Sequence, residues 1–266
     1  MSCDIVVCVK QVPHPDYLGK ISLDPTRRTI EREGVPAVIN PVDRNALEEA
    51  LRIRERFSGR ITVLTMGPPQ ARKALEDALA MDADTAIHLC DRAFAGADTL
   101  ATAQALAYGI RKLERFNLVL CGDTTIDSGT GQVAVQLAEF LDLPCITNAE
   151  ELTFEDEQRV LAKRIWERGY IKARIKLPAV IAVTDKINQP RLPTVSGIMA
   201  VAEKEIKDWS AADISADVSL VGITGSPTQV LDMTEFHAKR QGEILQGSPE
   251  EVVTLAIDRL VKLEIL

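Results

Sequence analysis

The residues best suited to hold a ligand lie between Gly122 and Gln132, in the run GDTTIDSGTGQ. This run contains three glycines, which let a backbone come close to a ligand, and four hydroxyl side chains. An apolar run precedes it and an amphipathic pattern follows it, so we expect it to join a buried strand to a helix that begins near Thr130. Free N–H groups and the positive end of the helix dipole at such a place suit a phosphate or pyrophosphate.

The same run lacks the residues of several known nucleotide chemistries. No lysine follows its glycines, which argues against a P-loop for nucleotide hydrolysis, and no G-x-G-x-x-G follows the first apolar run of the chain. Asp123 and Asp127 could accept hydrogen bonds from a ribose or a ring, but no histidine or nucleophile stands beside them. We therefore predict a binding loop without catalytic residues. A compact surface loop that binds nothing is the alternative.

Composition excludes several classes of protein. Of the 266 residues, 46% are hydrophobic and 26% are charged, which is an ordinary globular balance. A net charge of −8 without a basic block argues against a nucleic-acid partner. No apolar run approaches the roughly 20 residues that a membrane span needs, and the first residues read as a strand rather than a signal peptide. We therefore expect no membrane span and a cytoplasmic location.

The cysteines and histidines do not form a recognisable metal or disulfide pattern. The five cysteines (Cys3, Cys8, Cys90, Cys121 and Cys145) include no C-x-x-C pair, and most lie in or beside apolar runs. We expect all five to be reduced and structural, because a free cysteine in such a place behaves as a small hydrophobic residue. The three histidines lie far apart in sequence, and His88 reads as a strand residue. No metal site is predicted.

Short β-branched runs alternate with longer helical patterns, which is typical of an α/β fold with a doubly wound, mostly parallel sheet of the Rossmann-like kind. Between residues 150 and 176, charged alternating segments indicate antiparallel strands outside the parallel part. The pattern weakens between 186 and 247, which suggests an irregular arm. We expect an α/β nucleotide-binding domain over 1–185 and a separate region over 186–266. The expected strands are 4–9, 60–66, 84–90, 117–121 and 177–185, the expected helices are 40–57, 70–81, 97–116 and 249–266, and a small hairpin is expected over 19–32.

Several of these segments, taken together, resemble the β subunit of electron transfer flavoprotein. The resemblance rests on VCVKQVP, INPVDRNALEEALRIRE, TMGPPQARKALEDALAM, DRAFAGADTLAT and IDSGTGQVAVQLAEFL, and it covers nearly the whole chain. It implies a heterodimer with a homologous α subunit, whose FAD exchanges electrons with partner dehydrogenases. The β subunit would hold an adenine nucleotide, and the protein would be an electron carrier rather than an enzyme. Residues 186–266 would supply a recognition loop and a C-terminal arm that contacts the α subunit.

The resemblance also implies which residues hold the nucleotide. They lie after the first strand, at the start of the first helix, around the end of the second strand and in the glycine-containing loop. Those residues are Cys8, Asn40, Pro41, Val42, Asp43, Val63, Met66, Gly122, Asp123, Thr124, Thr125, Ile126, Asp127, Ser128, Gly129, Thr130, Gly131, Gln132 and Val133.

The identity of that nucleotide depends on two short motifs. Members of the family that only shuttle electrons hold AMP, whereas members that bifurcate electrons hold a second FAD. Thr130, Gln132 and Val133, together with the AFAGADT segment at 93–99, resemble the bifurcating type. The run from Ser128 to Gly131 departs from that type and leaves both nucleotides open, with FAD favoured. Phe94, Asp98 and Thr99 of AFAGADT, and the hairpin near Ile30, are the candidates to cover a flavin ring.

The segment 189–206 resembles the loop by which the family's β subunits dock on dehydrogenases. Val195, Ile198 and Met199 would then be apolar contact residues, whereas the simpler reading is an ordinary exposed loop. Two other functions compete with the family reading. A nucleotide-sensing module related to stress proteins usually ends near half this length, and an ATP-using ligase needs a Ser/Gly pyrophosphate motif that VKQVPHP does not provide.

Overall fold

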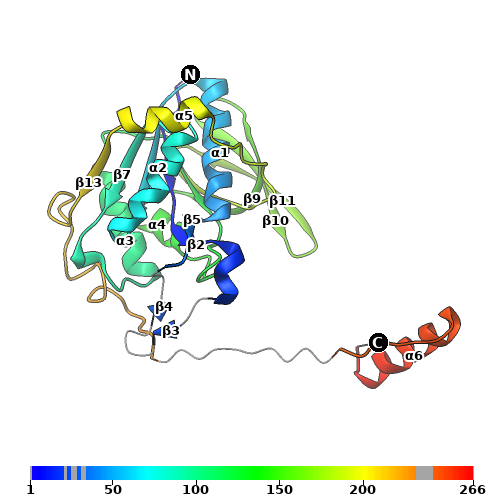
Figure 1. The fold of residues 1–266 in the computed structure, drawn as a ribbon. Helices are drawn as coiled ribbons and strands as arrows, with labels where there is room; N and C mark the ends of the chain where they lie inside the picture. Colours follow the sequence, from blue (N-terminus) through cyan, green and yellow to red (C-terminus); the bar gives the residue numbers. More distant parts are fainter. Residues whose placement is uncertain (1, 21–22, 25–28, 31–33, 232–241, 266) are drawn as a thin grey trace. The chain divides into compact units, whose positions relative to one another are not determined.

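A central sheet organises the larger part of the chain. The computed structural model describes residues 2–20, 23–24, 29–30, 34–231 and 242–265. The chain divides into two units, residues 1–231 and 232–266, which are described separately below. The sheet lies in the first unit (Figure 1). It has nine strands, in the order β11-β10-β9-β12-β8-β1-β6-β7-β13.

Neighbouring strands from β9 to β13 in this order pair in parallel, and β10 and β11 extend the β9 edge as an antiparallel hairpin. The central strands β1, β8 and β12 are apolar along their whole length because helices cover both faces of the sheet. The strands are β1 (Ile5–Cys8), β6 (Ile61–Met66), β7 (Thr85–Leu89), β8 (Leu118–Gly122), β9 (Cys145–Phe154), β10 (Arg159–Trp166), β11 (Gly169–Lys176), β12 (Ala179–Val183) and β13 (Ile206–Trp209).

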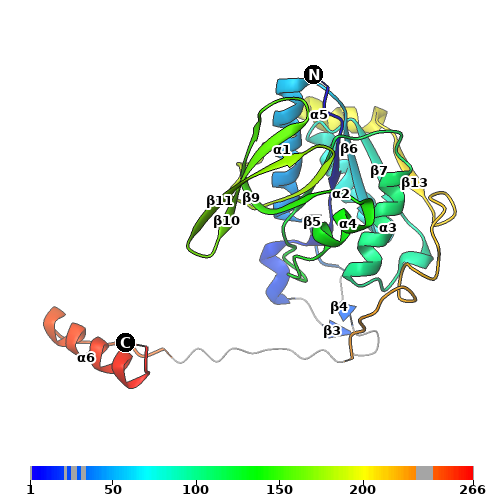
Figure 2. The same cartoon turned by 180° about the vertical axis from the view of Figure 1, so that it is seen from behind.

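Two pairs of helices cover the sheet, one pair on each face, as Figures 1 and 2 show from opposite sides. Helices α1 (Pro41–Phe57) and α2 (Arg72–Ala80) pack on one face over one apolar cluster. Helices α3 (Thr99–Arg111) and α4 (Val133–Leu141) pack on the other face over a second cluster. This arrangement confirms the predicted doubly wound α/β fold.

The strand order places a switch point between β1 and β8. From β1 the chain runs outward through β6 and β7, with α1 and α2 as the crossovers, and then returns to the other side of β1 through α3 and β8. In open α/β sheets, ligands bind beyond the carboxyl ends of the strands at such a point. The ends of β1 and β8 are Cys8 and Gly122, so the predicted loop lies at this point.

Several predicted elements end earlier or start later than expected. Helix α4 begins at Val133 and not near Thr130, because Gly129 and Gly131 have φ values of 61° and 62° that a right-handed helix cannot use. Helix α3 ends at Arg111 rather than at residue 116. A short 3-10 turn, η2 (Pro69–Ala71), precedes α2.

The structure also contains elements that the sequence pattern did not reveal. Strand β13 lies in the segment expected to be irregular, and it pairs with β7 in register from Ile206 to Trp209. A second small sheet pairs β2 (Gln11–Pro13) with β5 (Ala37–Ile39). The remaining short elements are η1 (Pro15–Lys20), η3 (Arg92–Phe94), α5 (Val195–Ala200) and η4 (Val201–Glu203).

The predicted hairpin near Ile30 is present as β3 (Leu23–Asp24) paired with β4 (Thr29–Ile30), and most of its predicted turn lies outside the described residues. The second unit contains helix α6 (Pro249–Lys262), which begins with the reciprocal hydrogen bonds of a capping box between Ser248 and Glu251. In the part of the chain that the structure describes, no helix is long and apolar enough to cross a membrane.

Candidate functional site

The end of β8 lies directly against the first turn of α1. The Gly122 N–H donates a hydrogen bond to Asp43 Oδ1 over 3.2 Å. A Cβ atom on residue 122 would lie 2.4 Å from that same oxygen, which is closer than such atoms can approach. Glycine is therefore required at this strand end because any side chain would push α1 away from the loop.

Asp43 is a buried carboxylate that several donors share. Its Oδ2 accepts the Lys10 N–H at 2.8 Å, and its Oδ1 also accepts from Asn40 Nδ2 at 3.0 Å. Burial raises the pKa of Asp43 to about 7, although these hydrogen bonds and the Lys10 charge oppose the rise. The carboxylate thus links the end of β1, the start of α1 and the end of β8.

Asn40 precedes α1 in the N-cap position, yet its side chain does not cap the helix. Asn40 Nδ2 donates to the Thr124 carbonyl at 2.9 Å, and Asn40 Oδ1 accepts the Ile126 N–H at 3.2 Å. The Asn40 amide therefore binds the loop backbone at Thr124 and at Ile126. Its position before a helix did not predict this role.

We call residues 122–127 the inner half of the loop and residues 128–132 the outer half. Besides the contacts of Gly122, Thr124 and Ile126, the Asp123 N–H donates to the Val183 carbonyl at 2.9 Å. Lys10 Nζ donates to Asp127 Oδ1 at 2.7 Å. The inner half is therefore fixed to β12, to the start of α1 and to Lys10, which lies two residues after the end of β1.

The outer half is exposed to solvent and makes few contacts with the rest of the protein. The Gly129 N–H donates to the Thr125 carbonyl at 2.9 Å, and the Ser128 and Thr125 hydroxyls lie 2.8 Å apart. Within the described residues, the N–H groups of Thr130, Gly131 and Gln132 donate no hydrogen bond. Several donors next to the start of α4 thus remain available to a ligand.

The AFAGADT segment approaches the outer half through one contact. The Thr99 hydroxyl donates to Gln132 Oε1 at 3.0 Å, so the start of α3 meets the end of the loop. Asp98 instead caps α3 through Ala101 N–H and accepts two hydrogen bonds from Thr228. Burial raises its pKa, but these hydrogen bonds outweigh that effect and hold the pKa below its ordinary value. Phe94 is buried in the apolar cluster under α3 and α4.

Cys8 and Cys121 are buried neighbours at the ends of β1 and β8. The contact with Cys8 and the burial of its thiol raise the pKa of Cys121 well above its ordinary value. All five cysteines carry free thiols, which agrees with the predicted reduced state. Two residues of β6 were predicted to belong to the site. Val63 is fully buried in the cluster under α1 and α2, whereas Met66 lies at the end of the strand and is partly exposed.

The structure thus brings together most predicted residues at one strand edge, but in two different roles. Cys8, Asn40, Val42 and Asp43 are buried and support the partly buried inner half, whereas the outer half is exposed and forms the accessible rim. Pro41 and Val133 are partly buried. Val63, Phe94 and Asp98 are engaged in the core or in a helix cap. Lys10 was absent from the predicted set, although its position two residues after a strand that ends at the switch point could have suggested it.

The predicted docking segment is exposed at its tip and fixed at its base. Val195, Ile198 and Met199 of α5 all project into solvent, with Val195 exposed to 76%. At the base, the Arg191 guanidinium binds both oxygens of Glu48 on α1, with Nε–Oε2 at 2.8 Å and Nη2–Oε1 at 3.1 Å. These contacts hold the segment on α1 and leave its apolar side chains free.

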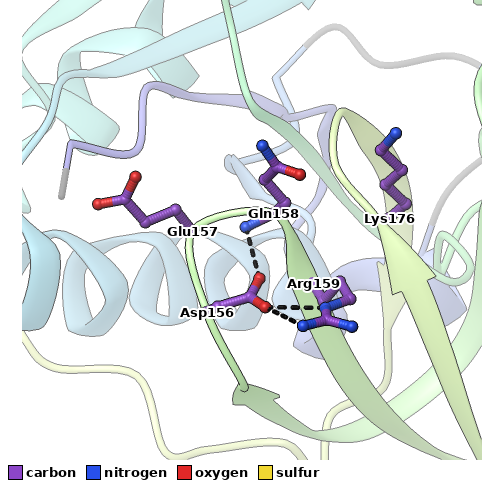
Figure 3. A pocket seen from close by; sticks show the side chains of 5 residues that line it. All are labelled: Asp156, Glu157, Gln158, Arg159 and Lys176. Atoms are coloured by element: carbon purple, nitrogen blue, oxygen red, sulfur yellow. Dashed lines mark hydrogen bonds and ion pairs between the residues drawn. The ribbon is translucent and has the colours of Figure 1, made fainter.

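A surface hollow at the β9–β10 turn, drawn in Figure 3, lies on a different part of the sheet. It is lined by Asp156, Glu157, Gln158, Arg159 and Lys176. Asp156 accepts hydrogen bonds from Arg159 and from the Gln158 N–H, so these groups satisfy one another. We do not assign this hollow to the candidate site. Among the described residues, no cluster of His, Cys, Asp and Glu could hold a metal ion.

Comparison with known proteins gives one family-model match and several similar proteins that agree with one another. Residues 28–214 match the family model described as the electron transfer flavoprotein domain. The chain is 43% identical over 258 residues to an electron transfer flavoprotein subunit beta from Thermoanaerobacterium thermosaccharolyticum, with 97% of each chain covered. It is 40% identical to the caffeyl-CoA reductase-Etf complex subunit CarD of Acetobacterium woodii, with 98% of this chain and 99% of that protein covered. It is also 36% identical to the acryloyl-CoA reductase electron transfer subunit gamma of Anaerotignum propionicum, with 98% and 99% covered.

Proposed function

Because the chain belongs to the electron transfer flavoprotein family, as a β subunit that acts in electron transfer, we propose that its 122–133 loop holds FAD. The single observation that carries this proposal is the division of the loop. Its inner half is fixed by Asn40, Asp43 and Lys10, while its outer half presents unpaired N–H groups at the start of α4. A preformed support with free backbone donors suits the pyrophosphate of a dinucleotide.

The residues present fit such a group in their chemistry. The outer half offers N–H donors from Thr130 to Gln132 and hydroxyls from Ser128 and Thr130, without a carboxylate among them. Gly129 and Gly131 adopt positive φ, a backbone conformation that occurs in the nests of N–H groups that bind anions. When bound, FAD would supply the electron-accepting ring, and the chain would contribute binding, orientation and local charge.

Two observations bear on the choice between FAD and AMP. The Thr99–Gln132 hydrogen bond supports FAD because it brings the AFAGADT segment to the loop, where a ring extending beyond the phosphates would need cover. The engagement of Phe94 in the core and of Asp98 in a helix cap supports the smaller AMP, since neither side chain is then free to cover a ring. We propose FAD and retain AMP, with FAD in the α subunit, as the second candidate.

The proposal extends to partners and to electron bifurcation. An α subunit would form the heterodimer, and dehydrogenases would dock on Val195, Ile198 and Met199, which are exposed above a base fixed by Arg191. Similarity to subunits named for caffeyl-CoA and acryloyl-CoA reductases supports a bifurcating role. The expected cytoplasmic location stays a prediction.

Identification of the bound nucleotides tests this proposal. The heterodimer would be purified without added nucleotide and denatured in acid, and the released compounds would be separated by chromatography. We expect FAD as the nucleotide released from the β subunit. Release of AMP with a single FAD per heterodimer would favour the second candidate, and release of no nucleotide beyond the α flavin would contradict both.

A further inference from the structure

The outer half of the loop is held at its two ends by side chains from outside the loop. Directly before its start, Asp127 accepts a hydrogen bond from Lys10 Nζ at 2.7 Å. At its end, Gln132 accepts one from the Thr99 hydroxyl at 3.0 Å. Between these contacts the chain is exposed, and it turns twice through positive φ at Gly129 and Gly131. The position of the free N–H groups therefore depends on these two contacts.

Lys10 is itself held rigidly on its backbone. Its N–H donates to Asp43 Oδ2 at 2.8 Å, and its carbonyl accepts the Asn40 N–H at 2.8 Å. Both partners belong to the beginning of α1, so the Lys10 backbone cannot shift without moving that helix. Its side chain consequently starts from a fixed point when it reaches Asp127.

The two members of this ion pair differ in burial. The Asp127 side chain is only 2% exposed, whereas the Lys10 side chain is 37% exposed. A nearly buried carboxylate depends on its charged partners, because removal of one leaves charge in a place that water hardly reaches. Without the Lys10 ammonium, Asp127 loses this ion pair, and we expect its side chain to shift and to move the start of the outer half with it.

We propose that Lys10 is a positioning residue for the nucleotide, acting through Asp127 to set where the outer half of the loop begins. This inference rests on the proposed nucleotide-binding function of the loop. Lys10 does not need to touch the nucleotide, since its effect passes through the loop backbone. A substitution that removes the ion pair would keep the backbone N–H donors of the outer half but would change their positions.

The test compares nucleotide dissociation from purified heterodimers. We expect Lys10→Met to release the β nucleotide roughly tenfold faster than the wild type, as loss of one charged hydrogen bond predicts, without changing the α flavin. Lys10→Arg should restore most of the retention because it keeps the charge. Lys73→Met is the matched control, since Lys73 forms its ion pairs with Glu76 and Asp77 on α2.

A second variant separates positioning from direct contact. Asp127→Asn keeps the shape of the side chain but weakens the pair, and we expect it to speed release as Lys10→Met does. If the Lys10→Met heterodimer does not assemble, the Asp127→Asn variant tests the inference by itself. Release rates equal to those of Lys73→Met, or an effect of Lys10→Met without one of Asp127→Asn, would overturn the inference. A wild-type heterodimer without a β nucleotide would instead contradict the proposed function on which it rests.

Discussion

The Gly122 N–H points at Asp43 Oδ1 from 3.2 Å, and no room remains between them for a side chain. This contact fixes the end of β8 on the first turn of α1, and the loop that follows takes its direction from it. The candidate site therefore depends on the absence of a side chain at Gly122 and on the buried carboxylate of Asp43.

The first prediction concerns Gly122→Ala. A Cβ atom 2.4 Å from Asp43 Oδ1 must displace α1 or the strand end, so we expect a loss of about 2 kcal/mol in the free energy of unfolding and weaker nucleotide retention. Chemical denaturation of the heterodimer measures the first effect. Gly169→Ala is the control because a Cβ there meets nothing within 4 Å. Equal free energies of unfolding for the two variants would contradict the prediction, because they would show that the structure around Gly122 accommodates a Cβ atom without loss of stability.

The second prediction concerns the pH dependence that Asp43 imparts. Its pKa is raised from 3.8 to about 7 by burial, so between these values the folded protein holds a proton that the unfolded chain has released. The contribution of Asp43 to stability is therefore present at low pH and is lost as the pH rises toward 7. We expect the difference in free energy of unfolding between wild type and Asp43→Asn to fall by at most about 1.4 kcal/mol per pH unit over this range. A difference that grows with pH would contradict the prediction.

The third prediction concerns the base of the docking segment. Arg191→Ala removes the guanidinium that binds both oxygens of Glu48, whose side chain is almost buried. We expect a loss of about 2 kcal/mol and faster proteolysis between residues 186 and 200. Arg191→Lys keeps the charge without the two-pronged geometry and should lie between wild type and Arg191→Ala. Unchanged proteolysis would show that α1 does not hold this segment.

The fourth prediction concerns the thiols. Burial raises the pKa of Cys145 to about 11, so its thiol is protonated and unreactive near neutral pH. We expect Cys145→Ala and Cys90→Ala to change stability by a few kcal/mol at most and to leave electron transfer intact. Loss of redox activity in a stably folded Cys90→Ala variant would reveal chemistry at that position.

The fold could be predicted from sequence because its main elements follow local patterns. The β-branched runs around Ile5, Ile61 and Leu118 are buried on both faces, and the spacing of Ala46, Leu47, Ala50 and Leu51 predicts the buried stripe of α1. Strand β13 could not be predicted in this way, since it lies at a sheet edge and is mostly not buried. Its pairing depends on β7, a partner far away in sequence.

The site could be predicted in its location but not in its division of roles. Glycines and hydroxyls after a buried strand pointed to the loop, and the family resemblance pointed to Asn40 and Asp43. The sequence did not reveal that Asn40 binds the loop backbone rather than capping α1, or that Lys10 pairs with Asp127. Both contacts join residues more than 80 positions apart, which local patterns cannot detect.

The flavin content of the Gln132→Ala heterodimer, measured beside the wild type, tests the central claim most directly. Gln132 accepts the Thr99 hydrogen bond at the end of the outer half, so its truncation should loosen the β nucleotide alone. We predict two FAD per wild-type heterodimer, and a Gln132→Ala heterodimer that loses the β FAD on gel filtration while it keeps the α flavin. One FAD and one AMP in the wild type would contradict the assignment of FAD, and a Gln132→Ala heterodimer that retains both flavins fully would contradict the role of this loop.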